Sequence, residues 1–143
     1  MDEQVIGVVF SQGRAFWPEV ALEYSVFRQH LARVLGDAPT WDWTRSGVEL
    51  YLICACLQGD AAAHRAFEAH TEVATAITRV EPEAAFVEEA LRALREKLFV
   101  GPRALLARYA GRSSLSPWLS VVAARLALDQ IRGRARPGGE RPN

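Results

Sequence analysis

Two cysteines and a histidine are the side chains of this chain that come nearest to a metal-binding motif. Cys54 and Cys56 lie two residues apart in an apolar segment, and His64 follows shortly after them. Side chains two residues apart on a helix point about 200° away from each other, so both thiols cannot readily reach one ion. We therefore expect two buried cysteines, no metal site and no disulfide framework.

The sequence gives no better evidence for acid–base or nucleophilic catalysis than for a metal site. The three histidines, His30, His64 and His70, lie on separate predicted faces or elements and have no obvious nucleophile beside them. The sequence contains no glycine-rich phosphate loop, no paired-carboxylate signature and no spacing that supports a Ser-His-Asp arrangement. We expect a protein that is not an enzyme and needs no cofactor.

The distribution of charge is the feature that indicates a binding partner. The 143-residue chain has a formal net charge of zero, but residues 1–102 carry 15 acidic and 9 basic side chains. Residues 103–143 carry 2 acidic and 8 basic ones. A basic end on an acidic body favours an anionic partner for the C-terminal part, of which nucleic acid is the commonest. The alternative is a solvated basic tail.

The elements that position these charges are predicted to be helices. Hydrophobic periodicity is helical almost throughout, and no stretch alternates apolar and polar residues for long enough to predict a strand. We therefore expect an all-α fold, a compact multi-helix bundle. The expected helices cover residues 25–36, 48–58, 61–80, 82–100 and 115–132, and loops cover 37–47 and 110–114.

Individual residues add detail to four of these expected helices. The second is apolar nearly all round, which predicts a buried position. Asp60 can cap the third, and Pro117 stands in the first turn of the last, where a missing amide hydrogen costs nothing. The fourth is expected to bury four residues of one face, namely Val87, Leu91, Leu94 and Leu98.

Targeting signals are absent from the sequence as it stands. The N-terminus opens with acids, and its apolar run VIGVVF is too short for the core of a signal peptide. No apolar stretch approaches the roughly 20 residues needed to span a bilayer. We expect a cytoplasmic protein with no membrane partner.

Residues 106–136, LARYAGRSSLSPWLSVVAARLALDQIRGRAR, resemble the promoter-melting segment of sigma-70 family RNA polymerase sigma factors of the extracytoplasmic-function (ECF) type. That family places an aromatic, a glycine, a Ser-Phe/Leu pair and a Thr-Trp-Leu before a helix of the form Ala-Arg-Asn-Leu-Ala-Ile-Asp-His-Leu-Arg. The positions that fall in register here are Tyr109, Gly111, Ser114, Leu115, Trp118, Leu119 and residues 126–132.

The resemblance continues upstream and covers roughly residues 17–134. LYLICACLQGDAAAHRAFEAH looks like the first part of sigma region 2, and FVEEALRALREKLFV resembles the segment that docks on the clamp helices of the polymerase's largest subunit. WPEVALEYSVFRQHLARVL looks like the leader of one subgroup. The implied organisation is an N-terminal helical extension over 1–46, a region 2-like domain over 47–134 and a disordered basic tail over 135–143. We expect region 2 only, without region 4.

The resemblance also implies roles for individual residues. Region 2 holds single-stranded promoter DNA, so arginines would contact its backbone, aromatics would stack on bases and the loop AGRSS would receive an extruded base. The DNA-binding residues implied are Arg103, Arg108, Tyr109, Arg112, Ser113, Ser114, Trp118, Arg125, Arg132 and Arg134. Those implied for RNA polymerase core are Phe86, Glu88, Glu89, Arg92 and Glu96. Filling the core is the other interpretation of Trp118.

The chain departs from the family pattern at several contact positions. Val121 and Ala124 stand where the family commonly has polar or basic residues, and Ala85 and Glu88 differ from the usual docking sequence. Three hypotheses follow. The chain is a promoter-melting sigma domain, or a non-initiating module that competes for polymerase core or binds an anti-sigma factor, or a helical binding domain with no polymerase role.

Overall fold

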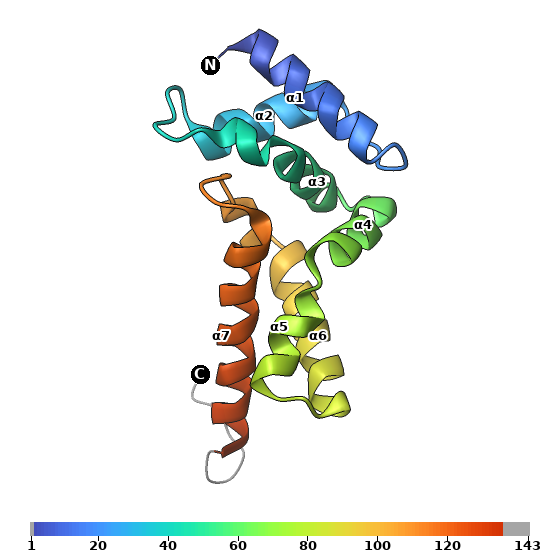
Figure 1. Ribbon diagram of the computed structural model, residues 1–143, viewed down its shortest axis with the longest axis vertical. Coiled ribbons are helices and arrows are strands. Elements are labelled where there is room, and N and C mark those ends of the chain that lie inside the picture. Colours follow the sequence, from blue (N-terminus) through green and yellow to red (C-terminus); the bar gives the residue numbers. More distant parts are fainter. Residues whose placement is uncertain (1, 136–143) are drawn as a thin grey trace.

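The computed structural model describes residues 2–135 of the chain, and side chains for residues 2–133. Within that range every regular element is helical, which confirms the all-α prediction (Figure 1). The elements are α1 (Glu3–Phe16), α2 (Tyr24–Leu35), η1 (Trp43–Ser46), α3 (Gly47–Leu57), α4 (Ala61–Thr71), α5 (Val73–Val80), α6 (Ala84–Phe99), η2 (Leu105–Arg108) and α7 (Leu115–Ala135), where η denotes a 3-10 helix.

The upper part of the molecule in Figure 1 is built from α1, α2 and α3, which pack on one another. Nearly every residue of α3 is buried, as its all-round apolar sequence predicts. Two glycines allow α1 and α3 to approach closely. A Cβ added at Gly13 would lie 2.3 Å from Cγ of Tyr51, and one at Gly47 would lie 2.5 Å from Cγ1 of Val9. The crossing of α1 over α3 therefore depends on residues without side chains.

The lower part consists of α5, α6 and α7, which pack against one another, and α4 joins it to α3 (Figure 1). α6 buries Phe86, Ala90, Leu94 and Leu98. The prediction that Val87 and Leu91 are buried was therefore wrong in part, because both are only half-buried at the flank of that face. The buried residues of α6 are spaced four apart and face α5 and α7. The buried face of the helix is therefore rotated by about one position from the predicted face.

The prediction of a single helix over residues 61–80 was also wrong. Glu72 adopts a left-handed conformation, φ 49° and ψ 41°, and separates α4 from α5. The two halves bury their apolar faces against different partners, α4 against α3 and α5 against α6 and α7. One straight helix could not satisfy both contacts, so the chain turns at Glu72. The predicted capping of α4 by Asp60 is confirmed, since its Oδ2 accepts the amide hydrogen of Ala63 at 3.0 Å.

The described part of the N-terminal segment, residues 2–46, contains α1, α2 and η1, and α1 was not predicted as a separate element. Asp2 caps α1 by accepting the amide hydrogen of Gln4 at 2.8 Å. Ile6 of α1 and Phe27 of α2 belong to the same continuous core as α3 and the lower helices. No helix within 2–135 has both the length and the apolarity to cross a membrane. The tail predicted over 135–143 lies outside the described residues, apart from Ala135, which ends α7.

Candidate nucleic-acid interface

The loop at residues 110–114 is held against the upper helices by hydrogen bonds from both sides. Trp41 Nε1 donates to the carbonyl oxygen of Ala110 at 2.9 Å, and Ser46 Oγ donates to that of Ser113 at 3.2 Å. The hydroxyl of Tyr109 donates to the same Ser113 carbonyl at 2.6 Å. The loop therefore has its backbone fixed before any ligand arrives.

Glu49 of α3 holds the first residue of α7. Its Oε1 accepts the amide hydrogen of Leu115 at 2.9 Å, and its Oε2 lies 2.8 Å from Nε2 of His70. The side chain of Glu49 is only 17% exposed. The first amides of a helix lack partners within it and carry its positive dipole end, so a carboxylate there stabilises the start of α7. Here the capping group comes from a different helix. Glu49 was missed by sequence reasoning, although it is the one charged residue in an otherwise apolar helix.

Gly111 brings the loop directly onto α3. Its φ is +70°, a conformation that L side chains rarely adopt, and a Cβ there would lie 3.0 Å from Cδ1 of Leu50. Both the backbone conformation and the space favour glycine at this position.

The two aromatic residues assigned to base stacking have different surroundings. Tyr109 is only 2% exposed, and burial raises its pKa to about 12. It therefore serves the core and the loop, and in this conformation it offers no face to a base. Trp118 is half-buried, with its ring 5.6 Å from that of Tyr109 at an interplanar angle of 62°. Trp118 thus packs on the core and keeps part of its ring accessible, so both interpretations of this residue fit.

An aromatic residue that the sequence did not single out supports one of the predicted cations. The guanidinium carbon of Arg112 lies 3.9 Å from the ring centroid of Trp41. A guanidinium stacked on an indole loses rotamer freedom and keeps its hydrogens at the ring edge available. Trp41 therefore fixes the loop through its ring nitrogen and positions a positive charge beside it through its ring face.

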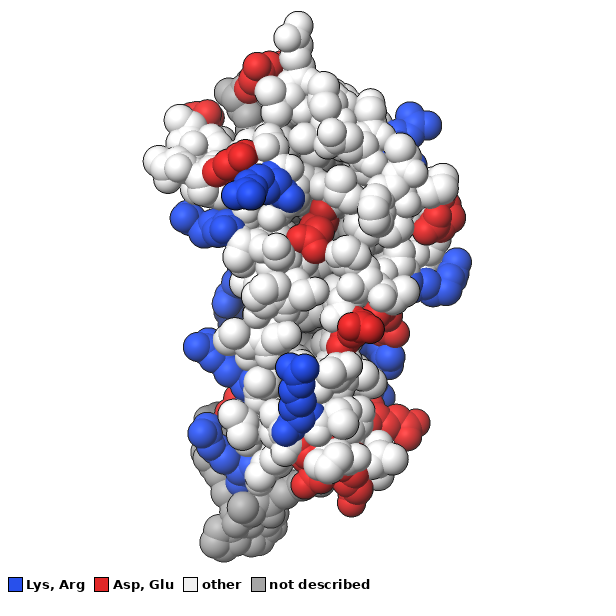
Figure 2. Space-filling model, in the orientation of Figure 1, with Lys and Arg blue, Asp and Glu red and all other residues white. Residues whose placement is uncertain are grey.

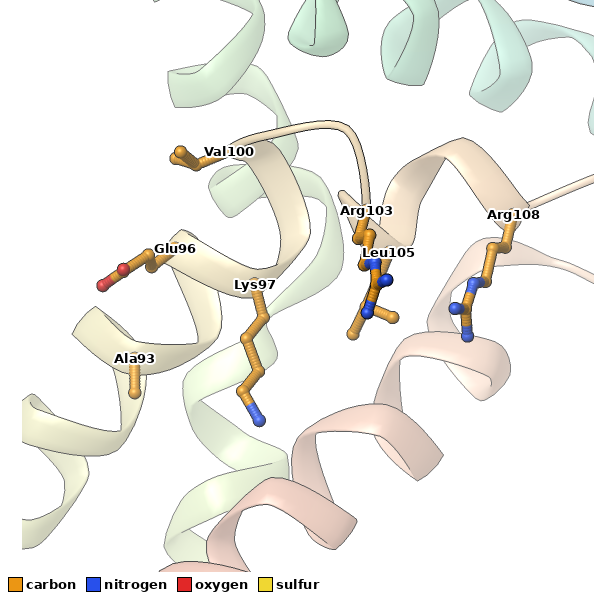
Figure 3. Close-up of a pocket in the computed structure, with 7 residues that line it drawn as sticks. All are labelled: Ala93, Glu96, Lys97, Val100, Arg103, Leu105 and Arg108. Atoms are coloured by element: carbon orange, nitrogen blue, oxygen red, sulfur yellow. The ribbon is translucent and has the colours of Figure 1, made fainter. Parts of the chain in front are cut away.

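Below the loop, three cations line one cavity of about 570 Å³ between α6 and η2. They are Lys97, Arg103 and Arg108, and Figure 3 shows their side chains extending in the same direction, toward α7. Lys97, the only lysine of the chain, was not among the predicted DNA-binding residues. The apolar wall of the cavity includes Leu105 and Val100.

Exposed arginines continue along α7. Arg125 and Arg132 are both exposed, and Arg132 pairs with Asp129 at 3.5 Å one turn away. In the lower half of Figure 2 cationic side chains follow the edge where α7 lies, and most acidic ones gather on the opposite side. The side chain of Arg134 lies outside the described residues. The structure thus brings most of the predicted arginines onto the side of the molecule that carries η2 and α7.

No protein-family model, curated protein or solved structure matches this chain. The geometry of its own residues is therefore what bears on its function. That geometry consists of a fixed polar loop, a half-buried tryptophan at the head of a long helix, and a series of cations along it.

The helix assigned to polymerase docking, α6, exposes only some of the residues that were expected to contact the polymerase. Glu88, Arg92 and Glu96 are exposed and spaced by four, so they share one face of α6, and Glu89 is exposed beside them. Phe86 is 0% exposed, and its side chain fills the core. Its assignment to a contact surface is therefore corrected, because the buried face of α6 begins at this residue.

The cysteines are buried, as expected. Cys54 and Cys56 are each 1% exposed and unpaired, and burial raises both pKa values to about 12. Neither thiol is therefore activated as a nucleophile. Among residues 2–135, no three histidine, cysteine or acidic side chains lie close enough together to hold a metal ion.

Proposed function

We propose that this chain is a sigma-like transcription initiation factor domain that binds RNA polymerase core and the melted minus-ten promoter element. One observation carries the proposal. A polar loop fixed by Trp41, Ser46 and Glu49 stands beside the half-exposed Trp118, at the head of the cation-bearing α7.

Single-stranded DNA needs three things from a protein, and this side of the molecule has a residue type suited to each. Backbone phosphates need cations, which Arg103, Arg108 and Arg112 supply. Bases need a flat apolar partner, for which the open part of Trp118 is suited. An extruded base needs a polar pocket that does not collapse, and the loop 110–114 already has the carbonyls of Ala110 and Ser113 bonded to the scaffold.

Fluorescence anisotropy with a labelled promoter strand tests the DNA half of the proposal. Trp118→Ala should weaken binding by about 1–3 kcal/mol, the worth of stacking one base, while the far-UV circular dichroism spectrum stays unchanged. Val121→Ala, one turn further along α7 and exposed, is the matched control and should bind as the wild type does. An unfolded Trp118→Ala protein would instead support the core-filling role of this residue.

The salt dependence of the same binding tests the cationic contacts. Arg108→Gln should reduce the slope of log K against log salt by about 0.7, because one phosphate contact fewer releases fewer counterions. Arg79→Gln, an exposed arginine on α5, should leave the slope unchanged. Equal slopes for the wild type and Arg108→Gln would remove Arg108 from the interface.

Co-elution with RNA polymerase core tests the second half. The face formed by Glu88, Glu89, Arg92 and Glu96 is the surface proposed to dock on the clamp helices of the largest subunit. A charge reversal, Arg92→Glu, should abolish co-elution without changing stability, since surface substitutions rarely alter it by more than about 0.5 kcal/mol. A wild-type protein that neither co-elutes with core nor binds the promoter strand would refute the proposal.

A second function is favoured by one feature of α7. Val121 and Leu128 are 51% and 43% exposed and interrupt the cationic side chains of the helix. Such a surface suits a protein partner, so the alternative is a regulatory module that occupies polymerase core or binds an anti-sigma factor without initiating transcription. Run-off transcription separates the two, because an initiator yields a transcript and a competitor suppresses the output of a complete sigma factor.

A further inference from the structure

The cavity of about 570 Å³ between α6 and η2 has a lining that the proposed DNA contacts use only in part (Figure 3). Arg103 and Arg108 are assigned to the backbone of a DNA strand, whereas Lys97 and the apolar wall take no part in that proposal. The volume of the cavity falls within the range of small-molecule sites. The lining can therefore form a binding site of its own.

Three cations from successive segments of the chain converge on this cavity. Lys97 stands in the last turn of α6, Arg103 in the turn that follows, and Arg108 at the end of η2. In Figure 3 their side chains extend in the same direction, whereas Glu96, the one acid of the lining, extends away from them. Water solvates each cation separately, so their convergence, and not a lack of partners, is what indicates a ligand. A cavity lined by charges of one sign focuses its field and concentrates ions of the opposite sign.

The dipole of α6 explains only one of these three positions. A cation in the last turn of a helix interacts with the negative end of the helix dipole, which accounts for Lys97. Arg103 and Arg108 lie outside α6, so its dipole gives no reason for their place beside the cavity. None of the three forms an ion pair with another described residue, so the protein itself does not neutralise the charge of the cavity.

The rest of the wall is apolar and partly open to solvent. Val100 is 64% exposed, the highest value for a large apolar side chain among the described residues. Ala93 and Leu105, which line the same cavity, are half-buried. Small-molecule sites combine an apolar lining with a few polar groups that fix the orientation of the ligand. The cavity therefore suits a ligand that carries both negative charge and an apolar body.

The compactness of the site favours several phosphates on one small molecule. Three cations around one cavity are best matched by several negative charges close together, which a polyphosphate chain carries on adjacent phosphorus atoms. A DNA strand carries one phosphate per nucleotide and a peptide at most one carboxylate per side chain, so either spreads the same charge over a longer segment. Lysine and arginine are the side chains that proteins commonly use to bind phosphate.

We propose that this cavity binds a small organic polyphosphate. Lys97, Arg103 and Arg108 contact the phosphate chain, and the organic group of the ligand lies against Val100 and Leu105. The site does not depend on whether α7 binds DNA. If it does, a bound polyphosphate occupies Arg103 and Arg108 and lowers the affinity of this side for a strand, a consequence that rests on the proposed function.

Isothermal titration calorimetry of the full chain with ATP, at fixed ionic strength and without divalent cations, tests the proposal. Inorganic tripolyphosphate keeps the phosphate chain without the organic group, and AMP keeps the organic group with one phosphate. ATP should bind saturably, tripolyphosphate about three- to tenfold more weakly, and AMP more weakly by about tenfold or more. No saturable binding of ATP, or equal affinity for AMP, would overturn the proposal. Equal affinity for tripolyphosphate would overturn the role given to the apolar wall.

Variants tie binding to the named residues. Lys97→Gln and Arg103→Gln should each weaken ATP binding about tenfold. Arg92→Gln is the matched control, because Arg92 is an exposed cation of the same helix that does not line the cavity, and its ATP affinity should equal that of the wild type. Val100→Glu places a negative charge at the cavity and should abolish ATP binding with the melting temperature unchanged. Equal losses in Lys97→Gln and Arg92→Gln would show unspecific attraction between charges and overturn the proposal.

The labelled promoter strand separates this site from the proposed DNA interface. ATP binding that is lost in Lys97→Gln supports the polyphosphate site even when no strand binds, an outcome that refutes DNA binding alone. A strand whose affinity falls in both Trp118→Ala and Lys97→Gln, in a protein that does not bind ATP, assigns the cavity to the strand backbone. That outcome overturns the polyphosphate proposal and leaves the proposed function standing.

Discussion

Replacing Glu49 with alanine should destabilise the protein, because this side chain holds the start of α7 at the candidate interface. Its carboxylate accepts the amide hydrogen of Leu115 at 2.9 Å and lies 2.8 Å from His70. Loss of a helix-capping acceptor costs about 1 kcal/mol, and leaving the amide of the buried Leu115 without its charged partner costs about 1–3 kcal/mol. The hydroxyl of Tyr109 also lies 3.4 Å from the Glu49 carboxylate, but it keeps its 2.6 Å hydrogen bond to the Ser113 carbonyl, so loss of the Glu49 contact adds little. We expect a total loss of about 2–3 kcal/mol.

Urea unfolding followed by far-UV circular dichroism measures this loss directly. For a chain of this length the same change lowers the melting temperature by roughly 5–10 °C. Glu49→Gln keeps an oxygen that can accept from Leu115 but removes the charge, so it should lose about half as much. The free energy of unfolding should therefore decrease in the order wild type, Glu49→Gln, Glu49→Ala. This order is as informative as the size of either decrease.

Amide hydrogen exchange locates the effect. In Glu49→Ala the amide of Leu115 and its neighbours in the loop should lose protection, whereas the middle of α7 should keep it. Glu88→Ala, an exposed acid on α6, is the control and should change stability by no more than about 0.5 kcal/mol. A loss below about 0.5 kcal/mol for Glu49→Ala would mean that the loop and the start of α7 hold their positions without this carboxylate, and the reasoning would be refuted.

Three further predictions concern burial and backbone geometry. Burial holds the pKa of His30 at about 4, below its usual 6.5, so the unfolded chain takes up the proton first. Stability should fall by about 3 kcal/mol in all as the pH drops from about 6.5 to about 4, and His30→Leu should lack this part of the dependence in urea titrations at several pH values. Gly111→Ala should lower the free energy of unfolding by about 1–2 kcal/mol, more than Gly59→Ala, which has a positive φ but open space around it. Phe86→Ala should cost about 3–5 kcal/mol in the same assay, whereas a residue of an open docking surface would cost little.

Local sequence signals predicted the elements that depend on local physics. The all-round apolar composition of α3 predicted its burial, and Asp60 marked the start of α4. These features depend on residues within one or two turns of each other, so a single sequence contains the information.

The errors arise where distant packing decides the outcome. Nothing within residues 61–80 requires the turn at Glu72, which follows from the different partners of α4 and α5. The rotation of α6 that buries Phe86 depends on where α5 and α7 lie. At the candidate interface the arginines could be found from charge alone, but Glu49 and Trp41 act through partners more than 60 residues away. Their roles are visible only once the chain has folded.

The anchoring of the loop at residues 110–114 has a consequence for the order of folding. Its hydrogen bonds join residues separated by 66, 67 and 69 positions in the chain. Closing such long segments costs entropy before any contact compensates for it, so these bonds form late, after α1, α2 and α3 have packed. During synthesis the chain must be extended beyond Leu115 before the loop can close on α3. The side of the molecule for which we propose DNA binding is thus completed last, and a nascent or partly unfolded chain does not display it.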